Sequence, residues 1–463
     1  MFYPEFIALQ EEALMKHTYA IRLVLALFFT APLLHASENP LGNLTSPAPQ
    51  PACPTPSGNP IFGRRLSTEY LKIIPYGYIK NEMYFDSRQI IGTRENQLLF
   101  FPAPRKLDRF CTDINDPGAW HMTAIESRFG ILMVGPTWGC ISVLGAIEGD
   151  FRGVVDADIS GLRLRHAFGL IKWPTGSFLY GQYWHPLFIP ACYPHTVGFA
   201  IGAPMEPQAR APQLRITQRW EWIEFIGAIS SQRDFQSTGP IGTSTVYIRN
   251  AISPNVTAEL RAYWESGLCG VVVDYLRLVP RLVSDLNISV QEHIASWTAE
   301  GYAAFTFPPF SLRSKVFWSQ NGTEQLLISG YGIRSIDPIT HKQTYSNTAA
   351  VGGWLDFSYT FHCDRMELGA FVGGTKNLGS RHRLVLNPTT GEPTVFALVG
   401  VAQNIDYVVR ISPRFLYAKD PIRFGIELEW TRASYGMMTP CATVVNGVPV
   451  NNYRLLTALY YVF

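Results

Sequence analysis

The sequence predicts an all-β fold, a transmembrane antiparallel β-barrel of about sixteen strands with short periplasmic turns and long extracellular loops. Only 16% of the 463 residues are charged, against about 25% in soluble globular domains. Apolar and charged residues alternate with a period of two in many segments, which is typical of strands with one apolar and one polar face. Short links also alternate with long ones along the chain. Together these observations favour a barrel whose outer surface contacts lipid.

Residues 1–36 have the three parts of a secretory signal peptide. A basic stretch begins at Met15, an apolar run covers residues 23–34, and Ala36 ends a small-residue cleavage site. Acidic residues precede Met15 and do not suit a basic start, so we predict Met15 as the true start. The apolar run is shorter than the roughly 20 residues that a membrane-spanning helix needs, and we expect residues 15–36 to be removed.

Two further parts follow the predicted signal peptide. Residues 37–70 begin SENPLGNLTSPAPQ, and such a Pro-rich tract predicts an extended periplasmic leader. Residues 71–463 form the predicted barrel. The seven cysteines all follow the signal, and their spacing does not reveal which of them pair.

Charged residues keep to one face of each predicted strand. A slip of one residue would exchange the two faces, so the alternation fixes the register. By the same alternation His166, Phe168 and Leu170 are assigned to the lipid side. The predicted lipid-facing residues elsewhere include Leu214, Ile216, Trp220, Phe424, Ile426 and Leu428, and the predicted water-facing residues include Arg215, Arg219, Arg423 and Glu427.

The links between strands support a barrel. We predict seven short links, at about 135–141, 172–176, 220–223, 265–270, 307–311, 362–365 and 417–421. Eight longer ones are expected at about 86–120, 152–161, 185–212, 233–254, 280–288, 319–350, 376–396 and 434–451. These links join sixteen strands, and an even number closes the wall without an edge. The strands of a soluble β-sandwich also alternate apolar and polar residues, but a sandwich has fewer apolar rows to bury.

Arginine dominates the predicted inner face of the wall. We count eleven basic and seven acidic residues there, a net charge of +4. Rings of cations in a water-filled pore select anions, and the fork of Arg binds carboxylate and phosphate well. The predicted pore-lining and anion-binding residues are Arg128, Arg163, Arg165, Arg215, Arg219, Arg410 and Arg414. Wall arginines can instead pair with wall carboxylates and only stiffen the interior, so both interpretations stay open.

Four segments resemble the DcaP-like outer-membrane porins of Gram-negative bacteria. They are YGYIKNEMYFDSRQ (76–89), LRLRHAFGLI (162–171), GQYWHPLF (181–188) and SQRDF (231–235). The resemblance runs from about residue 76 to residue 240 and, more weakly, to Phe463. It implies a sixteen-stranded, trimeric barrel that passes small anionic solutes. The leader has no heptad pattern, unlike family members with an N-terminal coiled coil.

Residues 185–212 are rich in Pro and Gly and join the fifth and sixth predicted strands. By analogy with general porins, a loop at this place folds inward and narrows the pore. An exposed extracellular loop is the alternative, and the sequence leaves both open.

The chain ends on Tyr460-Tyr461-Val462-Phe463. This ending is similar to the terminal aromatic signal by which the barrel-assembly machinery recognises outer-membrane barrels. We therefore expect a multi-pass β-barrel in the outer membrane of a Gram-negative bacterium. The expected partners are outer-membrane lipid, small anionic solutes and further copies of the chain as a homotrimer. A net charge of +2 gives no reason to expect nucleic acid.

No catalytic motif stands out in the sequence. We predict no catalytic residues, no metal and no cofactor, so the chain is not expected to be an enzyme. The leading hypothesis is a porin for passive diffusion of small hydrophilic, preferably anionic, solutes. The alternatives are a surface adhesin or structural barrel with a filled lumen and, third, a barrel enzyme such as a lipase or protease. Conductance across a planar bilayer separates the first hypothesis from the other two.

Overall fold

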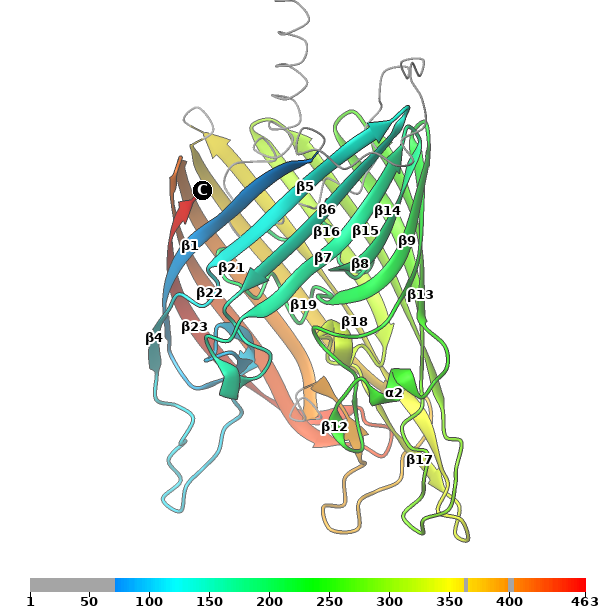
Figure 1. Cartoon of the computed structure of the whole chain (residues 1–463). Helices are drawn as coiled ribbons and strands as arrows, with labels where there is room; N and C mark the ends of the chain where they lie inside the picture. Colours follow the sequence, from blue (N-terminus) through cyan, green and yellow to red (C-terminus); the bar gives the residue numbers. More distant parts are fainter. Residues whose placement is uncertain (1–70, 362–364, 399–403) are drawn as a thin grey trace, which may run out of the picture.

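Sixteen antiparallel strands form a closed wall in the computed structural model of the chain (Figure 1). The structure describes residues 71–361, 365–398 and 404–463. The predicted signal peptide at 1–36 and the predicted leader at 37–70 lie outside the described residues. No helix among the described residues is long and apolar enough to cross a membrane.

The large sheet contains 19 hydrogen-bonded strands. Sixteen of them make the wall: β1 (Lys72–Asp86), β5 (Arg128–Trp138), β6 (Ile141–Asp150), β7 (Arg163–Trp173), β8 (Gly176–Trp184), β9 (Arg210–Trp220), β10 (Ile223–Ser230), β13 (Asn255–Trp264), β14 (Gly267–Leu278), β15 (Ile294–Phe307), β16 (Phe310–Gln320), β18 (Gln343–Phe361), β19 (Met366–Ser380), β21 (Ile405–Lys419), β22 (Ile422–Met438) and β23 (Val444–Val462). The other three extend the sheet at the loop end: β4 (Ala119–Thr123), β17 (Tyr331–Ile336) and β20 (Val395–Phe396). The loops also contain β2 (Ile90–Thr93), β3 (Leu98–Pro102), β11 (Thr238–Gly239), β12 (Gly242–Thr243), α2 (Val246–Arg249), η3 (Asp156–Asp158) and η4 (Thr323–Gln325).

The first and last strands close the wall. Tyr78 of β1 pairs with Val462 of β23, and the ladder continues to Asp86 opposite Arg454. The other edge of β1 pairs with β5 and β4. The remaining wall strands pair with their neighbours along the chain, so the all-β, sixteen-stranded barrel is confirmed and its wall has no free edge.

Turns and loops lie at opposite ends of the barrel (Figure 1). Six of the seven turns lie within the described residues, at 139–140, 174–175, 221–222, 265–266, 308–309 and 420–421, and the seventh short link joins β18 to β19 after Phe361. The eight longer links between wall strands are at 87–127, 151–162, 185–209, 231–254, 279–293, 321–342, 381–404 and 439–443. Each predicted link is thus found at its place in the chain. In outer-membrane barrels the turn end faces the periplasm and the loop end faces outside.

The last loop is much shorter than the predicted link at 434–451. The glycine, proline and asparagine residues there indicated a loop, but β22 and β23 continue as a hairpin to residues 439–443. Pro449 is accommodated because this part of β23 lies beyond the residues that pair with β1 and has β22 on one side only. Proline lacks an N–H donor and is therefore tolerated at such an edge.

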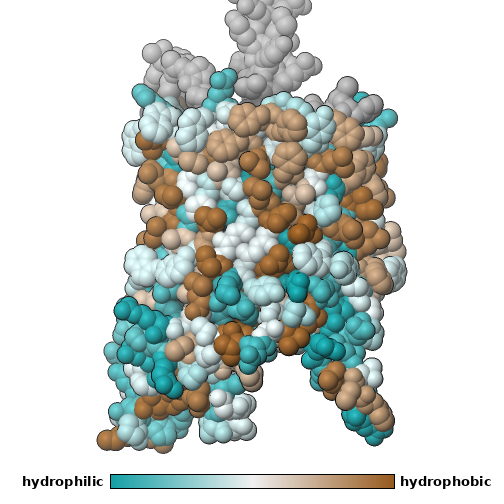
Figure 2. Space-filling view, turned by 180° about the vertical axis from the view of Figure 1, so that it is seen from behind, coloured by the Kyte–Doolittle hydropathy of each residue, from teal (hydrophilic) through white to brown (hydrophobic). Residues whose placement is uncertain are grey.

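The two faces of the wall differ in polarity. Leu214, Ile216, Trp220, Phe424 and Leu428 are exposed on the outer surface, while the alternating Arg215 and Glu427 are buried inside. The predicted faces of β9 and β22 are therefore confirmed. Figure 2 shows apolar patches over the wall and hydrophilic residues gathered toward the loop end.

An arginine at position 216 would test these faces. Ile216 lies on the outer face of β9 and is 48% exposed. We expect Ile216→Arg to lower the free energy of unfolding from a bilayer by about 2–4 kcal/mol, the cost of Arg near the lipid midplane. Gln218→Arg is the matched control, because it lies beside the turn at 221–222, where the cost is about 0–1 kcal/mol. Denaturant titrations of both refolded variants check this, and equal values would contradict the assigned depth.

A β-bulge exchanges the two faces in β7. The ladder between β6 and β7 skips one residue, Arg165. After this point His166, Phe168 and Leu170 face the interior and are buried. The prediction that these three residues face lipid is wrong, because one extra residue in a strand reverses the alternation that follows it.

Candidate functional site

The long loop between β8 and β9 folds into the barrel. Residues 185–209, which we call the inward segment, are buried almost throughout. Its two ends stay together, because Trp184 pairs with Arg210 and the N–H of His185 donates to the carbonyl of Ala209 at 2.9 Å. Of the two alternatives left open for this loop, the inward one is observed.

Charged wall residues hold the inward segment. Lys315 Nζ on β16 donates to Glu206 Oε1 at 2.7 Å, and Trp354 Nε1 on β18 donates to Glu206 Oε2 at 2.6 Å. Glu427 Oε2 on β22 accepts the backbone N–H groups of residues 197 and 198 at 2.6 and 2.9 Å. The two bonds to Glu427 satisfy backbone N–H groups of a loop that is removed from water, where unpaired N–H groups would be costly.

One contact shows that the inward segment spans the lumen. Arg410 Nη1 donates to the carbonyl of Ala203 at 2.8 Å. Arg410 belongs to β21, which lies eight strands around the wall from β9. Half of a sixteen-stranded barrel separates these strands, so the segment reaches the wall opposite its point of entry.

The first loop also enters the lumen. Residues 97–103, which include strand β3, are buried. Arg410 Nη2 donates to the carbonyl of Leu99 at 2.9 Å, and the hydroxyl of Tyr435 donates to the carbonyl of Pro102 at 2.6 Å. This loop was predicted to be extracellular, and the apolar run Leu98-Leu99-Phe100-Phe101 is the signal in the sequence that indicates its burial.

These segments meet in an apolar cluster inside the barrel. Leu98, Phe101, Leu187 and Phe199 come from the two loops, and they pack in a cluster with wall residues such as Trp354. Part of the lumen at this level is therefore filled by apolar side chains that exclude water. A passage for solutes has to run beside this cluster or open through its movement.

Three of the predicted pore-lining arginines meet in one ion-paired group. Arg163 Nη2 lies 2.6 Å from Asp150 Oδ2, and Arg165 Nε lies 2.6 Å from Glu148 Oε1. Arg128 Nε lies 3.6 Å from the same Glu148 oxygen. All five side chains are buried. These arginines face the interior, and each has a wall carboxylate as a partner.

Arg215 and Arg219 lie apart from that group. Arg215 donates to the carbonyl of Trp184 at 2.5 Å and to Gln213 Oε1 at 2.9 Å. No carboxylate of the described residues forms an ion pair with Arg215. Arg219 lies at the turn end, where its Nε donates to the carbonyl of Glu221 at 3.0 Å.

Arg410 and Arg414 complete the predicted set on β21. Arg410 Nε lies 3.3 Å from Glu429 Oε1 in addition to its carbonyl contacts. Arg414 lies between two carboxylates, 2.7 Å from Asp356 and 3.0 Å from Glu367. The seven arginines therefore do not form a ring of unpaired cations.

The buried charge is close to balance. Among the described residues, fourteen Lys and Arg and sixteen Asp and Glu are buried. The count of +4 from the sequence is too high, because it missed nine of these buried carboxylates but only five of the buried cations. The buried carboxylates that it left out include Asp86, Glu206, Glu224, Asp274, Glu300, Asp356 and Glu367.

Among the described residues, neither the cysteines nor potential metal ligands form a reactive centre. Cys140 is disulfide-bonded, while Cys111, Cys192, Cys269 and Cys441 are free thiols. Within residues 71–361, 365–398 and 404–463, no group of three or more His, Cys, Asp or Glu residues is placed to hold a metal ion.

Comparison with solved structures finds outer-membrane proteins, among them a channel and a porin. The outer membrane channel DcaP of Acinetobacter baumannii is similar with a TM-score of 0.60 and 15% identity, over 86% of this chain and 99% of that one. The trimer form of OmpT, an outer membrane protein of Vibrio cholerae, has a TM-score of 0.51 and 10% identity over 85% of this chain and 100% of that one. An anion-selective porin from Comamonas acidovorans has a TM-score of 0.50 and 7% identity over 85% of this chain and 100% of that one. No family model and no curated protein matches the sequence.

At these identities the likeness shows the fold. The chain has the fold of the outer membrane channel DcaP, so the DcaP-like porin fold that the sequence resemblance implied is confirmed. A closed sixteen-stranded wall with an apolar outer face is the architecture of a Gram-negative outer-membrane barrel.

Proposed function

We propose that the protein is a porin that lets small hydrophilic solutes diffuse across the outer membrane. The observation that carries this proposal is the inward segment, which spans a closed, charge-lined barrel and is fixed to its wall by hydrogen bonds. A segment in this position sets the cross-section of the lumen, and the charged wall favours polar solutes. We propose no catalytic role.

Single-channel recording tests the proposal. The refolded full-length protein is inserted into a planar bilayer, and discrete conductance steps are the expected result. Uptake of a small sugar into liposomes that contain the protein should exceed uptake into empty liposomes. Intact barrels that give neither steps nor uptake would overturn the proposal.

The finer proposal is a preference for anions. Its support is Arg215. The guanidinium donates to neutral oxygens, lies over the ring of Tyr183 and forms no ion pair with a described carboxylate. Arg163 and Arg165 each pair with wall carboxylates, so they contribute less net charge to a passing ion. Buried or partly buried charges are also screened less than exposed ones.

Reversal potentials across a salt gradient measure this preference. We expect the unmodified channel to favour the anion and Arg215→Gln to move the potential toward neutrality, because one uncompensated cation is lost. Arg249→Gln, an exposed residue of α2, is the control and should change nothing. Cation preference in the unmodified channel would contradict the proposal.

We further propose a homotrimer in the outer membrane. Its support is the fold shared with a protein solved in a trimer form. Phe463 has an exposed side chain at the turn end of the wall, where the assembly machinery could reach it. Mass photometry of the detergent-solubilised protein should show three copies, and a monomer at all detergent concentrations would contradict this.

A second candidate function is a closed barrel that serves as an adhesin or a structural protein. The apolar cluster inside the lumen favours this candidate. A water-free cluster of side chains stabilises the inward loops and also blocks the passage of solutes. Conductance decides between the two candidates. This candidate requires that the barrel show no conductance and that it bind surfaces through its loops.

A further inference from the structure

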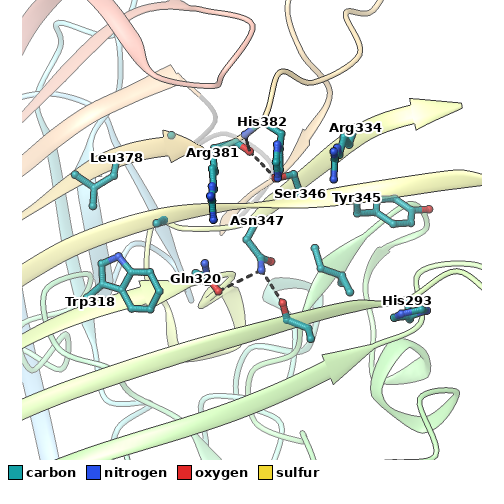
Figure 3. Close-up of a pocket in the computed structure, with 15 residues that line it drawn as sticks. His293, Trp318, Gln320, Arg334, Tyr345, Ser346, Asn347, Leu378, Arg381 and His382 are labelled. Atoms are coloured by element: carbon teal, nitrogen blue, oxygen red, sulfur yellow. Dashed lines mark hydrogen bonds between the residues drawn. The ribbon is translucent and has the colours of Figure 1, made fainter.

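We propose that a groove on the outer wall binds a phosphorylated lipid of the outer leaflet. The groove has a volume of about 770 Å³ and lies between β15 and β19 at the loop end (Figure 3). Figure 3 shows Trp318 and Leu378 at one end, Arg334 and His293 at the other, and Arg381 between them. An apolar end and a cationic end in one groove match the two parts of an anionic lipid.

The level of the groove in the membrane follows from β18. The outward-facing residues of this strand are apolar or aromatic from Tyr359 through Leu355 and Val351 to Ala349, and Asn347 comes next. Ten residues at about 3.3 Å each, tilted by about 40°, span about 25 Å, the height of the apolar band of an outer-membrane barrel. Asn347 lines the groove, so the groove lies where the apolar band ends and lipid headgroups begin.

Charge decides which lipid fits. None of the 15 residues that line the groove is Asp or Glu, whereas four are Arg or His. No ion pair joins Arg334 or Arg381 to any carboxylate of the described residues. The nearby Glu292 is occupied, because Arg281 Nη2 and the hydroxyl of Tyr345 donate to it at 2.7 and 2.5 Å.

The contacts of a phosphate ester follow from this arrangement. Two guanidinium groups offer forked N–H donors to the phosphate oxygens. The amide of Asn347, which donates to the carbonyl of Ala295 at 2.7 Å and to Gln320 at 3.4 Å, forms the polar floor between the two arginines. An acyl chain would lie against Trp318 and Leu378, which are 38% and 43% exposed. A second copy of the chain would instead need carboxylates opposite the arginines.

Native mass spectrometry with a phosphatidate probe tests the proposal. The full-length protein is held in neutral maltoside micelles, and phosphatidate is titrated in, with phosphatidylcholine and inorganic phosphate as separate arms. We expect saturable binding of phosphatidate, and weaker binding of both phosphatidylcholine and inorganic phosphate. Arg334→Gln and Arg381→Gln should each weaken it about fivefold, and the double variant about twentyfold.

Two further variants keep the outcome interpretable. Trp318→Ala should weaken phosphatidate binding while the weak signal of inorganic phosphate stays unchanged, and Arg249→Gln, exposed on α2, should leave both unchanged. Heat-modifiable gel migration confirms that each variant is folded. Equal phosphatidate binding by the wild type and the double variant would overturn the proposal. The proposal would also be overturned if the wild type bound no lipid and the double variant lost its oligomers. That result would assign the groove to a contact between copies of the chain.

Discussion

Replacing the inward segment by a two-residue Asn-Gly turn should raise the single-channel conductance severalfold. The change removes residues 185–209, the loop that spans the lumen from β9 to Arg410 on the opposite wall. The wall should survive, because Trp184 and Arg210 already pair and Asn-Gly suits a two-residue hairpin turn. Pore cross-section limits ion flow, so widening it increases current.

A second loop provides the control for this deletion. Residues 388–391 form an exposed tip whose flanks are joined, since the N–H of Asn387 donates to the carbonyl of Glu392 at 2.8 Å. The same Asn-Gly replacement there should leave the conductance unchanged. If the first variant folds, as judged by gel migration, and conducts like the wild type, the inward segment does not limit the pore.

Arg414→Gln should lower the free energy of unfolding by about 3–5 kcal/mol, the cost of removing one partner from a buried ion pair. Arg414 lies 2.7 Å from Asp356 and 3.0 Å from Glu367, and all three side chains are almost fully buried. Without the guanidinium, the two carboxylates keep only Arg313 nearby as a counter-charge, with its Nη1 3.9 Å from Asp356 Oδ1. Urea titration of the protein refolded into detergent micelles measures the change.

Neutralising the carboxylates should reverse that loss. The triple variant Arg414→Gln, Asp356→Asn, Glu367→Gln keeps similar side-chain shapes and removes the unpaired charges, so most of the stability should return. A single variant as stable as the wild type would contradict a structural role for this triad. It would also indicate that water reaches Arg414.

The sequence predicted the wall well because one face of each strand is constrained by lipid. The alternation around Arg215 and Glu427 gave the correct faces, and the positions of the links gave the number of strands. His166 and Phe168 were misplaced because a bulge adds one residue to β7 without any change in composition. The alternation of apolar and polar residues does not reveal such an insertion.

The filling of the lumen was harder to predict than the wall. A loop that folds inward carries apolar and charged residues for contacts with distant strands, such as Glu206 with Lys315. These contacts join residues far apart in sequence, and no local period reports them. The acidic wall residues were missed for another reason, since Asp274 follows three valines that make both faces of β14 look apolar.

The seam between β1 and β23 has a consequence for how the protein folds. Tyr78 and Val462 pair although they lie near opposite ends of the barrel chain, whereas the other wall strands pair as hairpins with their neighbours. Hairpins have low contact order and form quickly, but the seam requires nearly the whole chain to be ordered first. Seam closure is therefore the slow, last step of assembly. A tag fused after Phe463, whose backbone N–H and carbonyl both bond to Gly77, would act on that step, and a tag before β1 would interfere less.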